Sequence, residues 1–198
     1  MTGLKLYYFD LPGIAEQIRL TFRMGNIPFE DIRISMESWM TEHKAKAPAG
    51  TVPYLVLDNG SVLCESGAIL MYAAARAGLI PTDPVHGAYA QQALDLLASL
   101  TPIMRRFYME PNNKEEICAA MKARCVLIDK VIGKTLSADG YVAGNRLSYA
   151  DISVYSWTKK TLPFLQHDLG REVLRECPAL RRVTELVEKE PKIQAYYS

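Results

Sequence analysis

The sequence has neither an excess of charge of one sign nor a hydrophobic run long enough to span a membrane. Its 198 residues contain 23 Lys and Arg and 22 Asp and Glu, a formal net charge of +1. This balance excludes the basic surface that binding to nucleic acid or to anionic membranes requires. The N-terminus lacks the basic flank and apolar core of a secretory signal. We expect a soluble, cytoplasmic protein with no nucleic-acid or membrane partners.

Cysteine is also scarce, and its spacing excludes the usual metal motifs. There is no CxxC pair and no Cys/His cluster at metal spacing, so we expect no metal site. Cys118 and Cys125 fall on one helix face, about 10 Å apart and too far for a disulfide. We interpret both as small core residues in a reducing compartment, with reactive thiols as the alternative. That helix face consists of Cys118, Met121, Cys125, Ile128 and Ile132.

The first 78 residues have the pattern of a small α/β domain. Residues 4–9 (LKLYYF) are an aromatic-rich apolar run that predicts a strand. Ile14, Ile18 and Phe22 recur at helical spacing, and residues 29–34 alternate apolar and polar side chains as a second strand does. A strand, a helix and a strand within about 30 residues form a βαβ unit with parallel strands and a right-handed crossover.

The second half of this domain predicts a hairpin followed by a helix. Residues 38–47 form a partly helical connection to it. Short strands at 54–57 and 61–64 flank Asn59-Gly60, a pair that suits the positive φ angles of a tight turn. An Ala-rich helix then extends over residues 66–78 and ends on a glycine.

A change of composition at residues 79–87, which are rich in Pro and turn formers, predicts a linker. The residues after it, 88–198, have helical spacing. Ser148 and Asp151 precede an apolar run and fit a capping box. The predicted fold class is therefore an α/β domain at 1–78, joined by the linker to an all-helical domain. One apolar stripe of the second domain consists of Leu96, Leu100, Ile103 and Phe107.

Three stretches of the chain, taken in order, resemble the glutathione transferases. They are KLYYFDLPGIAEQIRL, VPYLVLDNGSVLCESGAILMY and YVAGNRLSYADI. The resemblance is to the sigma class, which includes prostaglandin D synthases of the haematopoietic type. It implies a thioredoxin-like N-terminal domain at 1–78 and an all-α C-terminal domain at 88–198. It also implies glutathione as co-substrate, no metal, and a homodimer.

Tyr8 is the expected catalytic residue. It ends the first strand beside the turn DLPG, at the carboxyl edge where open α/β sheets place their ligands. The resemblance implies that its hydroxyl donates to the sulfur of glutathione and stabilises the thiolate. Tyr7, whose side chain faces the other way, is interpreted as an ordinary strand aromatic.

The resemblance also implies a glutathione site at the strand entrance and at the helix start. Pro53 matches a proline with a cis peptide bond, which exposes the backbone of Val52 to pair with the cysteinyl part of glutathione. Glu65 and Ser66 begin a helix, whose N-terminus attracts a carboxylate. Ser66 would bind the γ-glutamyl carboxylate. Without the resemblance, Ser66 is only an N-cap and Pro53 a turn residue.

The connection before this site supplies the remaining glutathione contacts. Trp39, which we expect to be exposed, and Lys44 match family positions at the glycyl end of glutathione, with one apparent insertion between them. Thr51 occupies a binding position where a longer polar side chain is common. Two further departures are Ile14, in place of an arginine near the thiolate, and Ser99, in place of an aspartate that reaches the neighbouring subunit's glutathione.

The second substrate is expected to lie between the two domains. The resemblance places it over Phe9, Gly13 and Ile14, facing the helical segment from Met104 to Tyr108. This patch is apolar and suits hydrophobic electrophiles. No residue of the chain identifies the electrophile.

The resemblance implies an enzyme that transfers glutathione to hydrophobic electrophiles. Two alternatives stay open: a glutathione-dependent prostaglandin D isomerase, and a non-catalytic binding or structural protein on the same fold. A scaffold needs no thiolate stabiliser, so Tyr8, Pro53 and Glu65-Ser66 favour the enzyme. A thiol–disulfide oxidoreductase is excluded, because it needs a cysteine where the first strand meets the first helix and residues 8–13 contain none.

Overall fold

The computed structural model describes residues 3–197, so residues 1, 2 and 198 of the predicted domains lie outside the described part. The chain divides into two compact units, one ending at Leu79 and one beginning at Ile80. The first helix of the second unit starts at Pro84, within the predicted linker. Each unit is described by itself.

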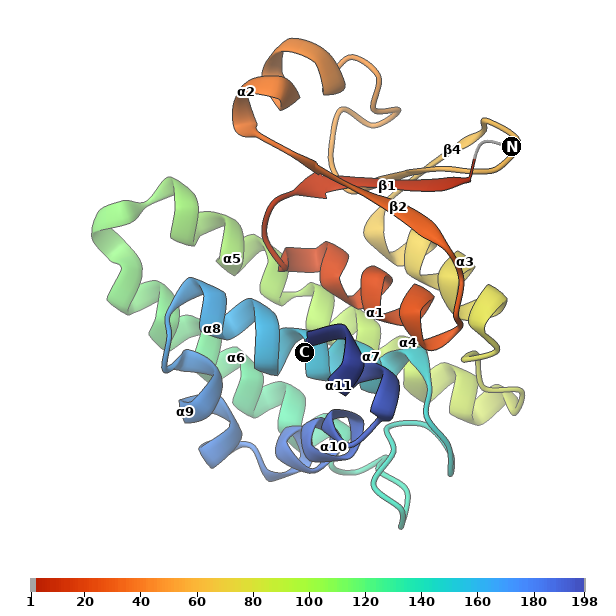
Figure 1. Ribbon diagram of the computed structural model, residues 1–198. Helices are drawn as coiled ribbons and strands as arrows, with labels where there is room; N and C mark the ends of the chain where they lie inside the picture. The colour runs from red at the N-terminus through yellow and green to blue at the C-terminus, as the bar shows by residue number, and fades with distance from the viewer. Residues whose placement is uncertain (1–2, 198) are drawn as a thin grey trace. The chain divides into compact units, whose positions relative to one another are not determined.

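The first unit is built on a four-stranded mixed sheet in the order β2-β1-β3-β4. β1 pairs in parallel with β2 and antiparallel with β3, and β3 pairs antiparallel with β4. Helices α1 and α3 pack together on one side of the sheet, and α2 lies on the other (Figure 1). The strands are β1 (Leu4–Phe9), β2 (Phe29–Ile34), β3 (Tyr54–Val56) and β4 (Val62–Cys64). The helices are a 3₁₀ turn (Gly13–Ala15), α1 (Glu16–Met24), α2 (Met36–Ser38), a π-helical turn (Trp39–His43) and α3 (Ser66–Ala77).

Side chains of β1 alternate between the two faces of the sheet. Leu4, Leu6 and Tyr8 are buried, while Tyr7 and Phe9 on the opposite face are half-buried. The predicted βαβ unit and hairpin are confirmed, with both hairpin strands one residue shorter than expected.

The prediction that Trp39 is exposed was wrong, because its side chain is only 7% exposed. It packs in a cluster with Ile34, Ala47 and Tyr54, and its ring meets that of Phe9 edge-on at 6.2 Å between centroids. Neither α1 nor α3 lies on this sheet face, so the connection that carries Trp39 supplies its cover (Figure 1).

The second unit is all-helical, as predicted. Its helices are α4 (Pro84–Ala98), α5 (Leu100–Met109), a 3₁₀ turn (Pro111–Asn113), α6 (Lys114–Ile132), α7 (Tyr149–Tyr155), a π-helical segment (Ser156–Thr161), α8 (Leu162–Leu165), α9 (Leu169–Glu176), α10 (Pro178–Glu188) and α11 (Pro191–Tyr197). The thioredoxin-like first unit and this helical second unit together confirm the predicted fold class.

The predicted apolar face of α6 is confirmed, since all five of its residues are buried. Burial raises the pKa of the Cys125 thiol to about 12, which suppresses its thiolate and favours the interpretation as a core residue.

The predicted apolar stripe on α4 and α5 is only partly buried, because Leu100 alone of its four members is fully buried. The stripe spans two helices, which meet at Ser99.

The predicted capping box before α7 is present and buried. Asp151 accepts hydrogen bonds from the backbone N–H of Ser148 at 2.8 Å and from its hydroxyl at 2.6 Å. Its other oxygen accepts from the backbone N–H of Val142 at 2.8 Å. One carboxylate therefore fixes both the start of the helix and the loop before it.

We predict that Asp151→Ala lowers the free energy of unfolding by about 3 kcal/mol, because it leaves buried N–H groups without an acceptor. Chemical unfolding of the purified protein measures this change. Asp139→Ala removes an exposed carboxylate and serves as the matched control. Equal losses in the two variants would contradict the structural role of the capping box.

Candidate active site

Tyr8 lies one residue before the end of β1 and is only 5% exposed. The turn that follows closes against its hydroxyl at Gly13. A Cβ at position 13 would stand 2.5 Å from the Tyr8 hydroxyl oxygen, and Gly13 has φ +46°, which favours glycine. Gly13 therefore has a local role that sequence analysis did not assign to it: it lets the turn approach Tyr8.

The pairing of the strands brings three predicted site residues into one row. Tyr7 is the partner of Tyr54 in the β1–β3 ladder, and Tyr54 is the partner of Cys64 in the β3–β4 ladder. Because both pairings are antiparallel, extending each by one residue sets Pro53 beside Tyr8, and Glu65 beside Pro53. The phenol, the proline and the start of α3 thus share one end of the sheet.

The Val52–Pro53 peptide bond is cis, as the resemblance implies. Pro53 is buried directly before β3, Val52 is half-buried and Thr51 is exposed. Glu65 has φ +69°, a conformation that costs a non-glycine residue about 1–3 kcal/mol and that collects at functional sites.

The first turn of α3 is open on its outer side. Ser66 is its first residue and is half-buried. Within the described part of the chain, no heavy atom lies within 4 Å of the place where a Cβ on Gly67 would stand. Free N–H groups and the positive end of the helix dipole at such a turn favour a carboxylate.

Trp39 and Lys44 are joined by a π-helical turn, in which the N–H of Lys44 donates to the carbonyl of Trp39 at 2.9 Å. A hydrogen bond from residue i+5 to residue i encloses one residue more than an α-helical turn does. A turn of this kind has room for the one-residue insertion expected between Trp39 and Lys44, and the insertion itself stays a prediction. The Lys44 side chain is exposed, whereas that of Trp39 is buried against the sheet.

His43, which the sequence did not single out, fastens this connection to the sheet. Its Nδ1 lies 3.2 Å from the Tyr54 hydroxyl, and its ring is 5.5 Å from that of Tyr7. Tyr7 and Tyr54 stack in parallel with 4.5 Å between centroids. Burial raises the pKa of Tyr54 to about 12, so its hydroxyl stays protonated.

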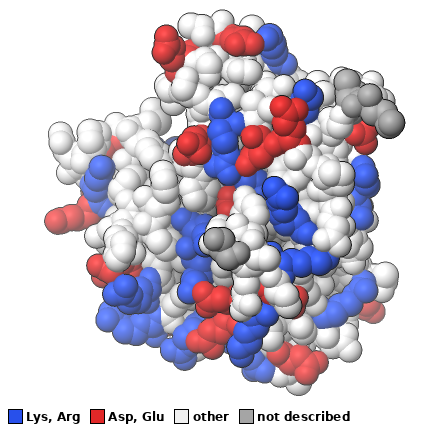
Figure 2. Space-filling view, in the orientation of Figure 1, with Lys and Arg blue, Asp and Glu red and all other residues white. Residues whose placement is uncertain are grey.

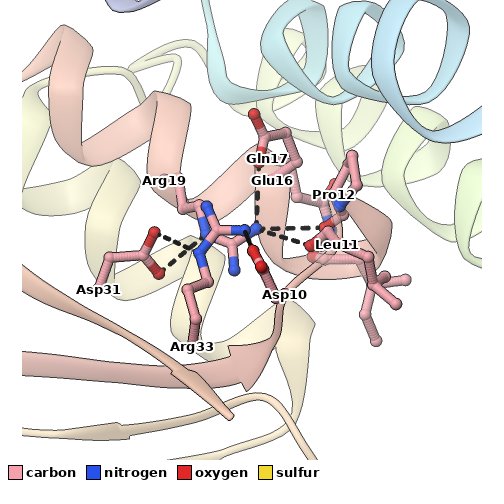
Figure 3. A network of polar contacts seen from close by, with 9 residues as sticks. Asp10, Leu11, Pro12, Glu16, Gln17, Arg19, Asp31 and Arg33 are labelled. Atoms are coloured by element: carbon pink, nitrogen blue, oxygen red, sulfur yellow. Dashed lines mark hydrogen bonds and ion pairs between the residues drawn. The ribbon is translucent and has the colours of Figure 1, made fainter. Parts of the chain in front are cut away.

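A network of ion pairs holds the turn after Tyr8 (Figure 3). Arg19 of α1 is paired with Glu16 at 3.1 Å and with Asp31 of β2 at 3.0 Å. Its guanidinium also donates to the carbonyl of Leu11 at 3.1 Å. The sequence signal for this network is a charged residue within the apolar face of a helix, and sequence analysis passed over it.

The residues expected at the second substrate divide between the two units. In the first unit, Phe9 and Ile14 are half-buried and Gly13 is buried. In the second unit, Met104 is 5% exposed and Tyr108 is 50% exposed. Their joint role at a second substrate stays a prediction.

The hydroxyl of Ser99 is occupied within its own chain. It donates to the carbonyl of Leu96 and accepts a hydrogen bond from Nε of Arg124 at 2.7 Å. Ser99 therefore has a structural role at the junction of α4 and α5.

Charged side chains of both signs are interspersed on the face seen in Figure 2. Among residues 3–197, none of the helices combines the length and the hydrophobicity needed to cross a bilayer. The same residues contain no group of three or more His, Cys, Asp or Glu side chains that could hold a metal ion.

The first unit brings a tyrosine, a cis proline and the start of a helix together at one end of a mixed sheet, and an all-helical unit follows it. Residues 6–81 match the family model of the glutathione S-transferase N-terminal domain, and residues 99–198 match that of the C-terminal domain. The chain belongs to the glutathione S-transferase family.

Relatives of known sequence and structure agree with this assignment. Glutathione S-transferase 1 of Ascaris suum is 32% identical over 200 residues, which cover 92% of this chain and 95% of the relative. The glutathione S-transferase structure from Ascaris lumbricoides superposes with a TM-score of 0.80 at 26% identity, covering 99% of this chain and 96% of that chain. The structure of prostaglandin synthase D of Nilaparvata lugens gives a TM-score of 0.83 at 25% identity, covering 99% and 97%.

We predict that Gly13→Ala lowers glutathione conjugation roughly a hundredfold, because a Cβ at this position displaces the turn from Tyr8. Initial rates with a hydrophobic electrophile measure the loss. Gly87→Ala is the matched control, since the nearest atom to its added Cβ is 4.0 Å away. A Gly13→Ala variant with the wild-type rate would show that the close approach of the turn to Tyr8 is dispensable.

Proposed function

We propose that this glutathione S-transferase forms the thiolate of glutathione with the help of the Tyr8 hydroxyl and directs it at hydrophobic electrophiles. The observation that carries the proposal is the row at the end of the sheet, in which Tyr8, Pro53 and Glu65 are neighbours by strand register. Tyr8 is buried at the carboxyl end of β1, where open α/β sheets bind their ligands.

The proposed reaction requires one hydrogen bond from the Tyr8 hydroxyl to the sulfur of glutathione. The thiol of glutathione resembles that of cysteine, with a pKa of about 8.5, so only a few per cent is ionised at neutral pH. Lowering this pKa by about two units takes about 2.7 kcal/mol of differential stabilisation. A neutral hydroxyl that donates to the sulfur in a sheltered site supplies interactions of this size and is not consumed.

The other glutathione contacts are proposed along the same row. The backbone of Val52, before the cis proline, pairs with the cysteinyl part of glutathione. The first turn of α3, with Glu65 and Ser66, receives the γ-glutamyl carboxylate. Lys44 neutralises the glycyl carboxylate, with Trp39 and Thr51 beside it. The burial of Trp39 limits its part to the indole edge.

The electrophile is proposed to occupy an apolar site formed by Phe9, Gly13 and Ile14 of the first unit together with Met104 and Tyr108 of the second. Ile14 makes its wall apolar where a sigma-class protein often has an arginine. A general role in detoxification of hydrophobic electrophiles on a sigma-like scaffold fits these residues.

Prostaglandin D isomerase activity is the second candidate, and the likeness to the prostaglandin synthase D of Nilaparvata lugens favours it. The isoleucine at position 14 weighs against it, because it supplies neither charge nor donor near the sulfur. A non-catalytic role is disfavoured by the same row of Tyr8, Pro53 and Glu65, with Ser66 next to it. Cytoplasmic location stays a prediction of the sequence.

We predict that Tyr8→Phe lowers conjugation roughly tenfold to a thousandfold, the scale of losing one donor to a developing anion. Its affinity for glutathione, measured by calorimetry, changes only a few-fold. Tyr7→Phe is the matched control, because that ring lies on the opposite face of the sheet and stacks on Tyr54.

Measuring conjugation, isomerisation and peroxide reduction of the wild type and of Tyr8→Phe side by side also decides between the transferase and the isomerase. Wild-type conjugation by Tyr8→Phe would exclude it as the thiolate donor.

We further propose a homodimer in which the first unit of one subunit packs on the helical unit of its partner. Because the Ser99 hydroxyl is bonded within its own chain, we expect little communication between the two glutathione sites. One chain has a mass of 22.2 kDa, and sedimentation at micromolar concentration is predicted to give a species of twice that mass. A single species at the chain mass would contradict the dimer.

A further inference from the structure

Arg19 is completely buried, and among the described residues it is the largest side chain with an exposed fraction below 2%. It lies in α1 between Ile18 and Leu20, which are also fully buried. A charged side chain is almost never fully buried unless it is paired, because removal of an ion from water costs several kcal/mol. The ion pairs with Glu16 and Asp31 meet this condition.

The contacts of Arg19 do more than neutralise its charge. Its Nη1 also donates to the carbonyls of Leu11 and Pro12, at 3.1 and 3.4 Å, in the turn that closes on the Tyr8 hydroxyl. Only a guanidinium, with several donors in a planar fork, reaches two carboxylates and this turn at once. Figure 3 shows Arg19 between Asp31 and the turn.

The same guanidinium lies over the ring of Tyr8, with its carbon 5.7 Å from the ring centroid. This separation is within the range of a cation–π interaction, which is stronger when both groups are desolvated. Its Nη2 is buried without a hydrogen-bond partner in the described structure, so the ion pairs and the turn do not use all of its donors.

We propose that Arg19 is a positioning residue for Tyr8. It anchors the turn that holds the phenol in place, and it sets a fixed positive charge against the ring. A fixed cation near the ring stabilises the phenolate form, so it makes the hydroxyl more acidic and a stronger hydrogen-bond donor to a thiolate. This inference rests on the proposed role of Tyr8 and assigns a second residue to the same site.

Other charged groups near Arg19 also contribute to the electrostatic environment of the Tyr8 hydroxyl. Glu16 shares α1 with Arg19, Asp31 and Arg33 belong to β2, and Asp10 belongs to the turn. Arg33 pairs with Asp31 at 2.7 Å and with Asp10 at 3.3 Å. Removal of Arg19 therefore leaves Asp31 with a partner but takes away the ion pair of Glu16.

The test is an ultraviolet titration of the Tyr8 hydroxyl in the protein without glutathione, taken as the difference from the same variant that also carries Tyr8→Phe. Arg19→Gln is expected to move the midpoint upward by about one pH unit. The rising limb of conjugation against pH is expected to move in the same direction, with kcat roughly tenfold lower at neutral pH. Arg19→Lys keeps the charge, so its midpoint is expected to stay while kcat falls through loss of the turn contacts.

Arg23→Gln is the matched control, since it removes a cation from the same helix that lies over another ring, that of Phe29, at 5.3 Å, and it is expected to leave the Tyr8 midpoint unchanged. Should Arg19→Gln fail to fold, the double variant Glu16→Gln, Arg19→Gln replaces the pair without a net charge change and is expected to shift the midpoint in the same direction. An unchanged Tyr8 midpoint in Arg19→Gln, or in the double variant where only that one folds, would overturn the proposal. A shifted midpoint in that variant, together with a wild type that conjugates no electrophile, would overturn only the proposed function.

Discussion

The arrangement of the candidate site depends on the antiparallel pairing of β3 with its two neighbours. β3 has only three residues, yet its registers with β1 and β4 set Tyr8, Pro53 and Glu65 in one row. A shift of one residue in either ladder would turn the Tyr54 side chain to the other face and separate the phenol from the start of α3. The register of this short strand therefore sets where Tyr8, Pro53 and Glu65 lie relative to one another.

Local patterns were sufficient for most of the fold. An aromatic-rich apolar run predicted β1, alternation predicted β2, Asn59-Gly60 predicted the hairpin, and Ser148 with Asp151 predicted the start of α7. Each of these signals depends on residues close in sequence. The burial of Trp39 could not be predicted in this way, since it depends on which sheet face the helices leave uncovered. The stripe through Leu100 crosses a helix break at Ser99, which apolar spacing alone does not show.

The candidate site was predictable from the sequence only where a motif is contiguous. The residues that hold it in shape come from contacts across the fold: His43 with Tyr54, Gly13 with Tyr8, and Arg19 with Asp31. An arginine within the apolar face of a helix signals a buried charge but does not identify its partners. The π-helical turn is a similar case, because the spacing of the sequence does not show that Lys44 bonds back to Trp39.

The central claim is that Tyr8 stabilises the thiolate of bound glutathione, and the thiol itself reports on it directly. Thiolate absorbance in the ultraviolet, followed against pH with the protein saturated by glutathione, gives the pKa of the bound thiol. The account predicts a value about two units below the free value of about 8.5 in the wild type, and one close to the free value in Tyr8→Phe. A bound thiol that titrates near its free value in the wild type, or identically in both proteins, would contradict the account.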